Sequence, residues 1–213
     1  MQIWTIVVAA GSGARFGGAK QFRSVGAERL VDRAVETATR SSDGVVVVLP
    51  AGETWDGPPV AAAVSGGATR AESVRAGLAA VPDAVDIVVV HDAARPLADD
   101  ALFRLVIDAV TDGIDGAIPA LAVSDTIKRV DDGRVIATVP RDDLVSVQTP
   151  QAFRAATLRA AHAGGAEGTD DAALVEAVGG IVVIVAGNAS NLKVTGPEDL
   201  MLVTALLSLR SPS

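Results

Sequence analysis

The sequence predicts an α/β domain, a three-layer sandwich built on a mostly parallel, twisted sheet. Short runs rich in valine and isoleucine alternate with helical patterns along the whole chain. Several of these runs are almost entirely apolar, as expected of parallel strands that helices cover on both faces. The 213 residues contain no linker and no low-complexity tract. We therefore expect residues 1–213 to form a single domain with a substantial core.

The expected elements follow one another in an alternating order. The strand-like runs are Trp4–Ala9, Val45–Leu49, Val60–Val64, Ile87–Val90, Ala117–Leu121, Val145–Gln148 and Ile181–Ala186. Helical patterns lie at Leu30–Ala38, Arg70–Ala80, Asp100–Thr111, Ala152–Ala161, Asp171–Val178 and Pro197–Leu209. The last helix begins with proline and two acidic residues, which are favoured in a first helical turn.

Two segments depart from this alternation. Ala51–Pro59 has nine residues and two prolines, whereas a parallel crossover usually needs about a dozen residues or more. We expect a short loop there without a full helix. Residues 125–141 predict a β-hairpin, with Ile127–Val130 and Arg134–Val139 flanking the turn Asp131-Asp132-Gly133. Because an isolated two-stranded ribbon is marginally stable, we expect this protruding arm to pack on a second subunit.

The composition excludes several classes of protein. The formal net charge of −8 disfavours nucleic acid as a partner, because binding it requires a basic surface. The absence of cysteine excludes disulfides, a thiol nucleophile and thiolate metal sites. No apolar run approaches the roughly 20 residues of a membrane span, and the N-terminus lacks the basic region of a signal peptide. We expect a cytoplasmic protein without membrane or nucleic-acid partners.

A glycine-rich loop carrying two cations follows the first expected strand. Gly11-Ser12-Gly13 leads to Arg15, and Gly17-Gly18 leads to Lys20. Glycines let the backbone approach a ligand and direct its N–H groups toward it, while the two side chains add positive charge. This combination of residues indicates a polyphosphate site.

Three other interpretations of this loop fit less well. Gly13 and Gly18 have the spacing of a P-loop, but Ala19 occupies the lysine position and a Mg²⁺-binding hydroxyl is missing. A dinucleotide fingerprint is disfavoured because Phe16 stands where a third glycine is needed. A purely structural turn after an edge strand explains the glycines but not the two cations, and we rank it second.

A second motif, His91-Asp92-Ala93-Ala94-Arg95-Pro96, follows the expected strand Ile87–Val90. Ligands of open α/β sheets bind outside the carboxyl ends of the strands, so Asp92 and the glycine loop should face one crevice. There a carboxylate can hold Mg²⁺ against phosphates, and Arg95 can bind a second anion. An Asx turn with a surface ion pair accounts for this motif equally well when it is taken alone.

Three further segments have structural as well as functional interpretations. Gly66–Val74 is a strand-to-helix turn whose helix N-terminus suits a base carbonyl or phosphate, although capping by Thr69 or Ser73 is favoured when the segment is taken singly. Thr169-Asp170-Asp171 has the pattern of a helix cap. Lys193 lies in a strand-like segment, Asn191–Thr195, and the alternative to a functional role is that it is a solvated lysine. The two histidines lack metal-like spacing, and no local motif suggests a Ser/His/Asp set.

These motifs, in this order, resemble the cytidylyltransferases that make 4-diphosphocytidyl-2-C-methyl-D-erythritol in the non-mevalonate isoprenoid pathway. The resemblance covers nearly the whole chain. The matching residues are Ala9 to Gly13, Arg15, Lys20-Gln21, Gly66-Gly67, Arg70, Ser73-Val74, His91 to Pro96, Asp125 to Lys128, Arg141, Gln148 to Gln151, Thr169-Asp170, Asn191 to Thr195 and Pro197-Glu198-Asp199.

The resemblance implies a Rossmann-like nucleotidyltransferase fold and a Mg²⁺-dependent reaction of CTP with 2-C-methyl-D-erythritol 4-phosphate that releases pyrophosphate. It also implies a homodimer across which the arm reaches. In the family, Arg15 and Lys20 match stabilisers of the transition state, and Arg141 and Lys193 match residues that place the nucleophile. The matching nucleotide-binding positions are Ala9, Ala10, Gly11, Ser12, Gly13, Lys20, Gly67, Arg70, Ser73, Asp92 and Ala93. The matching polyol-phosphate positions are Asp92, Arg95, Thr126, Arg141, Thr169 and Lys193, and Asp92 is the candidate metal ligand.

Three alternative functions stay open to different degrees. Related cytidylyltransferases use ribitol 5-phosphate, and the cytidine motifs do not separate the two substrates. A non-catalytic nucleotide-binding module is disfavoured because Arg15, Lys20, Arg141 and Lys193 are all present. An NAD-linked oxidoreductase is disfavoured by Phe16.

Overall fold

The computed structural model describes residues 1–13 and 16–210 and has a central mixed sheet of eight strands. Seven strands follow one another in the order β10-β7-β11-β6-β1-β4-β5, and β12 also pairs with β7. The strands of this sheet are β1 (Ile3–Val8), β4 (Gly44–Leu49), β5 (Ala62–Ser65), β6 (Ile87–Asp92), β7 (Gly116–Ala122), β10 (Val145–Val147), β11 (Gln151–Arg154) and β12 (Val182–Ala186). The helices are α1 (Leu30–Ser41), α2 (Arg70–Ala79), α3 (Asp100–Asp108), α4 (Ala155–His162), α5 (Asp171–Ala177) and α6 (Pro197–Arg210).

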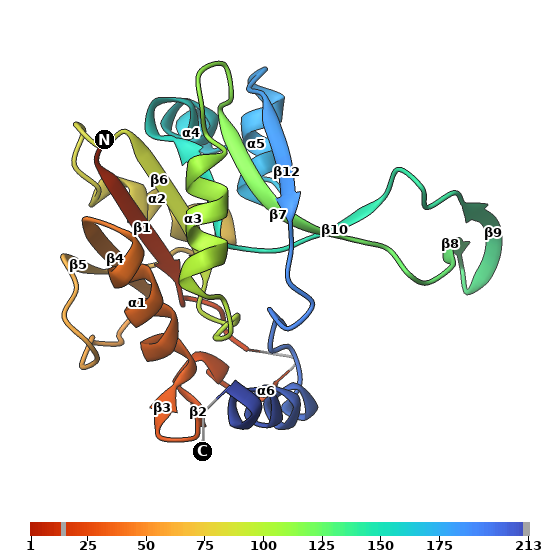
Figure 1. The fold of residues 1–213 in the computed structure, drawn as a ribbon, viewed down its shortest axis with the longest axis horizontal. Coiled ribbons are helices and arrows are strands. Elements are labelled where there is room, and N and C mark those ends of the chain that lie inside the picture. Colours follow the sequence, from red (N-terminus) through yellow and green to blue (C-terminus); the bar gives the residue numbers. More distant parts are fainter. Residues whose placement is uncertain (14–15, 211–213) are drawn as a thin grey trace.

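Two separate hydrophobic clusters show that the sheet is the middle of three layers. Along β4, Val45, Val47 and Leu49 pack in the cluster that contains apolar residues of α1 and α3. Val46 and Val48 face the opposite way, into the cluster formed with α2, α4 and α5. Successive side chains of a strand point to opposite faces, so a continuous valine run fills both clusters. The predicted three-layer sandwich is confirmed (Figure 1).

The sheet is mostly parallel, but two short strands run the other way. β1 pairs in parallel with both β4 and β6, and β12 pairs in parallel with β7. β11 is antiparallel to β6 and β7, and β10 is antiparallel to β7. This arrangement places the ends of β1 and β6 at the same edge, with Val8 opposite Asp92.

The helix expected over Ala152–Ala161 begins later than predicted. Gln151–Arg154 forms β11, where Ala152 and Phe153 are fully buried beside Val89 and Val88 of β6. Only then does α4 begin, at Ala155. A four-residue strand is too short to show a period of its own, and the alanines that follow favour a helix, so pairing with β6 and β7 decides the structure here.

Two smaller expectations are also corrected. The segment Asn191–Thr195 is not a strand, although Asn191 and Val194 within it are buried. The structure also contains a small antiparallel pair, β2 (Ser24–Val25) and β3 (Glu28–Arg29), that the sequence did not indicate. The loop 51–59 has no helix, as predicted.

The hairpin consists of β8 (Ile127–Asp131) and β9 (Arg134–Val139), which pair only with each other. Asp132 and Gly133 in its turn both have positive φ, at 43° and 73°. Figure 1 shows this arm extending away from the sandwich. Val130, Val135 and Ile136 on it are 58–62% exposed, so the arm presents apolar side chains to its surroundings.

The C-terminal helix α6 lies against the β2–β3 pair rather than on the sheet (Figure 1). Val203 of α6 joins Val25, Leu30, Leu97 and Val194 in a third hydrophobic cluster. Within residues 1–13 and 16–210, no helix is both long enough and apolar enough to cross a lipid bilayer.

Candidate active site

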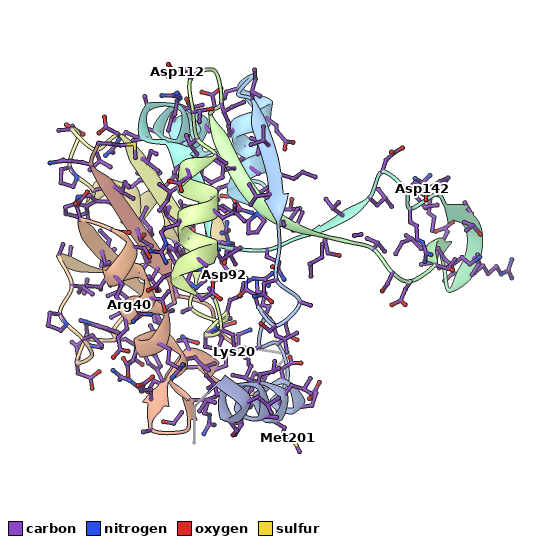
Figure 2. All side chains as sticks on the ribbon, in the orientation of Figure 1. Lys20, Arg40, Asp92, Asp112, Asp142 and Met201 are labelled. Atoms are coloured by element: carbon purple, nitrogen blue, oxygen red, sulfur yellow. The ribbon has the colours of Figure 1, made fainter. Side chains whose placement is uncertain are left out.

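A cavity of about 600 Å³ opens where β1 and β6 end. Its walls come from the loop after β1, the turn before α2, the end of β6 and the segment that leads to α6. Figure 2 shows Asp92 and Lys20 in this region, between the ends of the strands and α6. The expectation that Asp92 and the glycine loop face one crevice is therefore confirmed.

Most of the residues proposed from the sequence line this cavity. They are Ala9, Ala10, Gly11, Ser12, Gly13, Lys20, Gly67, Arg70, Ser73, Asp92, Ala93 and Lys193. Other lining residues were not proposed from the sequence as ligand contacts, namely Val8, Phe16, Gln21, Ala68, Thr69, Ala94 and Thr195. Arg15 lies outside the described residues, so its predicted role stays a prediction.

The glycine loop folds back on itself at Gly13. The carbonyl of Gly13 accepts hydrogen bonds from the backbone N–H groups of Phe16 at 2.8 Å and Gly18 at 3.3 Å. Gly13 has φ +65°, and a Cβ atom there would lie 1.8 Å from the Gly18 carbonyl oxygen. Only glycine fits this position, because a side chain would meet rigid backbone.

Two side chains at the end of the loop connect it to neighbouring segments. Lys20 Nζ donates to the Val194 carbonyl at 2.6 Å, and Gln21 Nε2 donates to the Gly11 carbonyl at 3.2 Å. Lys20 also lines the cavity. The loop therefore presents Lys20 toward the same space as Asp92, with the segment before α6 beside it.

Asp92 lies between two cations at the centre of the cavity wall. Lys193 Nζ is 2.6 Å from its Oδ2 atom, and Arg70 Nε is 3.3 Å from Oδ1. The Asp92 side chain is only 11% exposed. Burial by itself would raise the pKa of Asp92, but the charges of Arg70 and Lys193 outweigh it and hold that pKa well below its usual range. The surface ion pair considered from the sequence is thus a buried one that faces a cavity.

The turn before α2 serves both as a helix cap and as cavity wall. Thr69 Oγ1 accepts from the Glu72 N–H while the Glu72 carboxylate accepts from the Thr69 N–H, which is a capping box. Ser73 Oγ donates to the Thr69 carbonyl and accepts from the Gly67 N–H. The capping interpretation of Thr69 is confirmed, and both hydroxyl residues also line the cavity.

His91 supports Asp92 from inside the protein. It is fully buried, and its Nδ1 lies 3.1 Å from Thr149 Oγ1, which accepts the Asp92 N–H at 3.0 Å. Burial lowers the pKa of His91 to about 4, with Asp92 raising it and Arg95 lowering it by smaller amounts. The imidazole is therefore neutral near pH 7, and its role is structural, because it contacts the threonine that holds the Asp92 N–H.

The structure does not bring the remaining polyol-phosphate candidates to the cavity wall. Arg95 donates instead to the carbonyls of Asn191 at 2.8 Å and Val147 at 3.4 Å, which fixes the segment that carries Lys193. Thr126, Arg141 and Thr169 are exposed, and Arg141 donates to the Ser124 carbonyl at the base of the arm. Figure 2 shows Asp142, the neighbour of Arg141, on the arm and away from the sandwich.

The chemistry of the cavity fits Mg²⁺ that arrives with a phosphate ligand. Within the part of the chain that the structure describes, no group of three or more His, Cys, Asp or Glu residues could hold a metal by itself. Asp92 supplies one buried, ionised carboxylate. Mg²⁺ is commonly held by one or two carboxylates together with substrate phosphates and water, so this donor set fits.

Comparisons with known proteins were consistent across sequence and structure. The family model described as IspD: 2-C-methyl-D-erythritol 4-phosphate cytidylyltransferase matches residues 3–209. A Frankia casuarinae protein of that name is 43% identical, and the match covers 100% of this chain and 84% of the relative. A bifunctional enzyme IspD/IspF from Solidesulfovibrio magneticus is also 43% identical, with 94% of this chain matched to 56% of the relative. The chain thus spans little more than half the length of that relative.

A solved structure gives the same assignment. The crystal structure of 2-C-methyl-D-erythritol 4-phosphate cytidylyltransferase from Thermus thermophilus superposes with a TM-score of 0.83 at 37% identity, covering 98% of this chain and 100% of that one. A family model that spans almost the entire sequence and relatives above 40% identity leave one assignment. The chain belongs to the 2-C-methyl-D-erythritol 4-phosphate cytidylyltransferase family.

Proposed function

We propose that this protein transfers a cytidylyl group from CTP to 2-C-methyl-D-erythritol 4-phosphate and releases pyrophosphate. The observation that carries the proposal is the cavity in which Arg70 and Lys193 contact Asp92 and Lys20 lines the wall beside a glycine loop. Cations and open backbone suit a nucleoside triphosphate, and a lysine held by a carboxylate suits a second phosphate. The names of its relatives supply the identity of the two substrates.

In the proposed reaction the substrate is its own nucleophile. A phosphate oxygen of the methylerythritol phosphate attacks the α-phosphorus of CTP, a new P–O bond forms, and the bond to the leaving pyrophosphate breaks. Catalysis then consists of holding two anions in line and stabilising the charge that develops. Lys20 and Arg15 stabilise the charge that develops on the α-phosphate and the leaving group. Lys193 and Arg141 orient the attacking phosphate.

Asp92 is the residue that would hold Mg²⁺ on the triphosphate. When bound, the ion supplies positive charge that offsets the negative charge of the phosphates. Lys193, which pairs with Asp92, exchanges this carboxylate for the phosphate of the second substrate when that substrate binds. Ala9, Ala10, Gly67 and Ala93 leave room for the cytidine.

The arm gives the reason for proposing a homodimer. Thr126 and Arg141 are exposed and do not line the cavity of their own chain. Val130, Val135 and Ile136 on the arm are exposed as well. A second copy related by two-fold symmetry would cover them and would receive Thr126 and Arg141 at its own cavity. Thr169, exposed at the start of α5, completes the polyol-phosphate side. The setting we propose is the cytoplasm, without nucleic acid or membrane as a partner.

The test is pyrophosphate release measured with CTP and each polyol phosphate in parallel. We expect release with methylerythritol phosphate that depends on Mg²⁺ and little with ribitol 5-phosphate. Release with ribitol 5-phosphate alone would move the protein to the related enzyme class. Binding of NAD without binding of CTP would overturn the nucleotidyltransferase assignment altogether.

A further inference from the structure

Behind Asp92, a buried network of charged side chains continues away from the cavity. Arg70 contacts Asp92 through Nε, and its Nη1 atom donates to Asp171 Oδ2 at 2.7 Å. The other oxygen of Asp171 lies 3.0 Å from His162 Nε2. Asp171 and His162 do not line the cavity, and their side chains are 1% and 3% exposed. This network joins the end of α4, the start of α5 and the start of α2 to the cavity wall.

The geometry points to Asp171, supported by His162, as a positioning residue that fixes Arg70 against Asp92. This inference rests on the proposed function, in which Asp92 would hold the metal ion of the nucleotide, and on Arg70 as the nucleotide-binding position expected from the sequence. Asp171 touches neither ligand and acts through the guanidinium of Arg70.

The planar guanidinium makes this indirect action possible. Its nitrogens form a rigid fork, so a hydrogen bond at Nη1 also fixes the direction of Nε. Burial by itself would lower the pKa of Arg70, but Asp92 and Asp171 together raise it above its usual range. Arg70 therefore stays charged between two carboxylates, one facing the cavity and one behind it. Without Asp171, the 3.3 Å contact to Asp92 would be the one hydrogen bond left to the long arginine side chain among residues 1–13 and 16–210.

His162 in turn orients Asp171. A carboxylate only accepts hydrogen bonds, so Nε2 of His162 carries the proton in this contact. The Nδ1 atom is buried and has no hydrogen-bond partner among the described residues. The imidazole is thus held at one nitrogen, and its one polar contact is with Asp171. Asp170, the residue before Asp171, accepts a hydrogen bond from Gln151 of β11 at 3.0 Å and caps α5. The start of α5 is therefore fixed in place on both sides of Asp171.

The experiment is a double-mutant cycle with Asp171→Asn and Arg70→Lys. Asparagine keeps the shape and one acceptor for Arg70 but removes the charge, and lysine keeps the charge of Arg70 but removes the fork. We expect Asp171→Asn to weaken Mg²⁺-CTP binding in calorimetry and to lower kcat/KM, each by about tenfold, as is typical when an outer partner of a functional group is lost. In the Arg70→Lys background the same substitution should add less than about twofold, because its effect passes through the guanidinium.

Asp115→Asn is the matched control. Asp115 is also a carboxylate with two partners, Thr157 Oγ1 and the Ile181 N–H, but it does not line the cavity and has no contact with this network. It should leave CTP binding and kcat/KM unchanged whatever it does to the melting temperature. The inference would be overturned if Asp171→Asn lost the same CTP affinity in the Arg70→Lys background as in the wild-type background. It would also be overturned if Asp171→Asn had the CTP affinity and turnover of the wild type.

If Asp171→Asn does not fold, two substitutions of His162 test the same inference. His162→Gln keeps an N–H donor near the Nε2 position, and His162→Phe removes it. We expect the phenylalanine variant to bind CTP about threefold more weakly and the glutamine variant to recover most of the loss; identical affinities would overturn the inference. Binding is measured with Mg²⁺-CTP and without a polyol phosphate, so wild-type protein that binds CTP but does not transfer it would refute the proposed function and not this network.

Discussion

The cavity and the arm differ in where they place the polar side chains proposed for the site. Around the cavity, Lys20, Lys193 and Arg70 each have a partner within the same chain at 2.6–3.3 Å. On the arm, Arg141 and Thr126 are exposed and do not line that cavity. On the proposed function, the nucleotide side of the site is therefore preorganised in one chain, and the polyol-phosphate side takes Thr126 and Arg141 from the arm of a second copy.

The largest effect that separates the two regions is expected at Lys20. Removing one preorganised cation from the transition state typically costs about 10²–10³ in turnover, so Lys20→Ala should act mainly on kcat. The measurement is steady-state kinetics with both substrates varied, with circular dichroism and thermal melting as a check of folding. A Lys20→Ala enzyme with nearly normal kcat would show that the lysine only links the glycine loop to Val194.

Mixing two inactive variants tests whether the arm serves the other subunit. If each site combines Lys20 of one chain with Arg141 of its partner, then Lys20→Ala and Arg141→Ala should each be almost inactive. Refolding the two variants together in equal amounts gives about half heterodimers, each with one intact site, so activity should return to roughly a quarter of wild type.

Differential tags on the two variants confirm that subunits have exchanged. A fully exchanged mixture that is no more active than its parents would place both residues at the same chain's site. The comparison between a self-contained cavity and a shared arm would then fail.

Sequence reasoning found the cavity better than the network behind it. The cavity residues follow strands, and the ends of neighbouring parallel strands must meet at one edge, so Asp92 and the glycine loop could be placed together. Arg70 and Asp171 are 101 positions apart and join two helix starts, which no local pattern reveals. Asp171 looked like part of a cap because Asp170, its neighbour, does cap α5.

The fold shows the same division between local and long-range information. Valine runs predicted the parallel strands because burial on both faces leaves a distinct pattern. β11 was not predicted, because Ala152 and Phe153 form a strand through pairing with β6 and β7. Those strands lie far away in the sequence, so no local pattern indicates the pairing. The Asn191–Thr195 segment has strand-like composition, but its side chains pack without a ladder.

The buried polar groups beside the cavity should also make stability depend on pH. Burial lowers the pKa of His91 to about 4, whereas an exposed histidine titrates near 6.5. Between these values the unfolded chain binds a proton that the folded protein does not, so stability falls as the pH drops from about 6.5 to 4. The full shift corresponds to roughly 3 kcal/mol.

Urea unfolding at several pH values checks this prediction by comparing wild type with His91→Asn. The variant starts less stable at pH 7 because a cavity forms beside Phe103. Its curve should nevertheless be flatter than that of wild type between about pH 6.5 and 4.5. Parallel curves over this range would mean that His91 binds a proton in the folded state as easily as in the unfolded one.

The smallest expected effect concerns Thr69 and distinguishes helix capping from ligand binding. Thr69 caps α2, and it also lines the cavity, where its hydroxyl could contact the nucleotide. Loss of an N-cap hydroxyl costs about 1 kcal/mol, so Thr69→Ala should lower the melting temperature by roughly 2–4 °C. Thr69→Ser keeps the oxygen that accepts the Glu72 N–H and should melt close to wild type. If Thr69 only caps α2, the KM for CTP should follow stability and differ little between the two variants at a temperature where both are folded. A KM that rises severalfold in Thr69→Ala and is restored in Thr69→Ser would instead show that the hydroxyl contacts the nucleotide, which would add Thr69 to the preorganised side of the site.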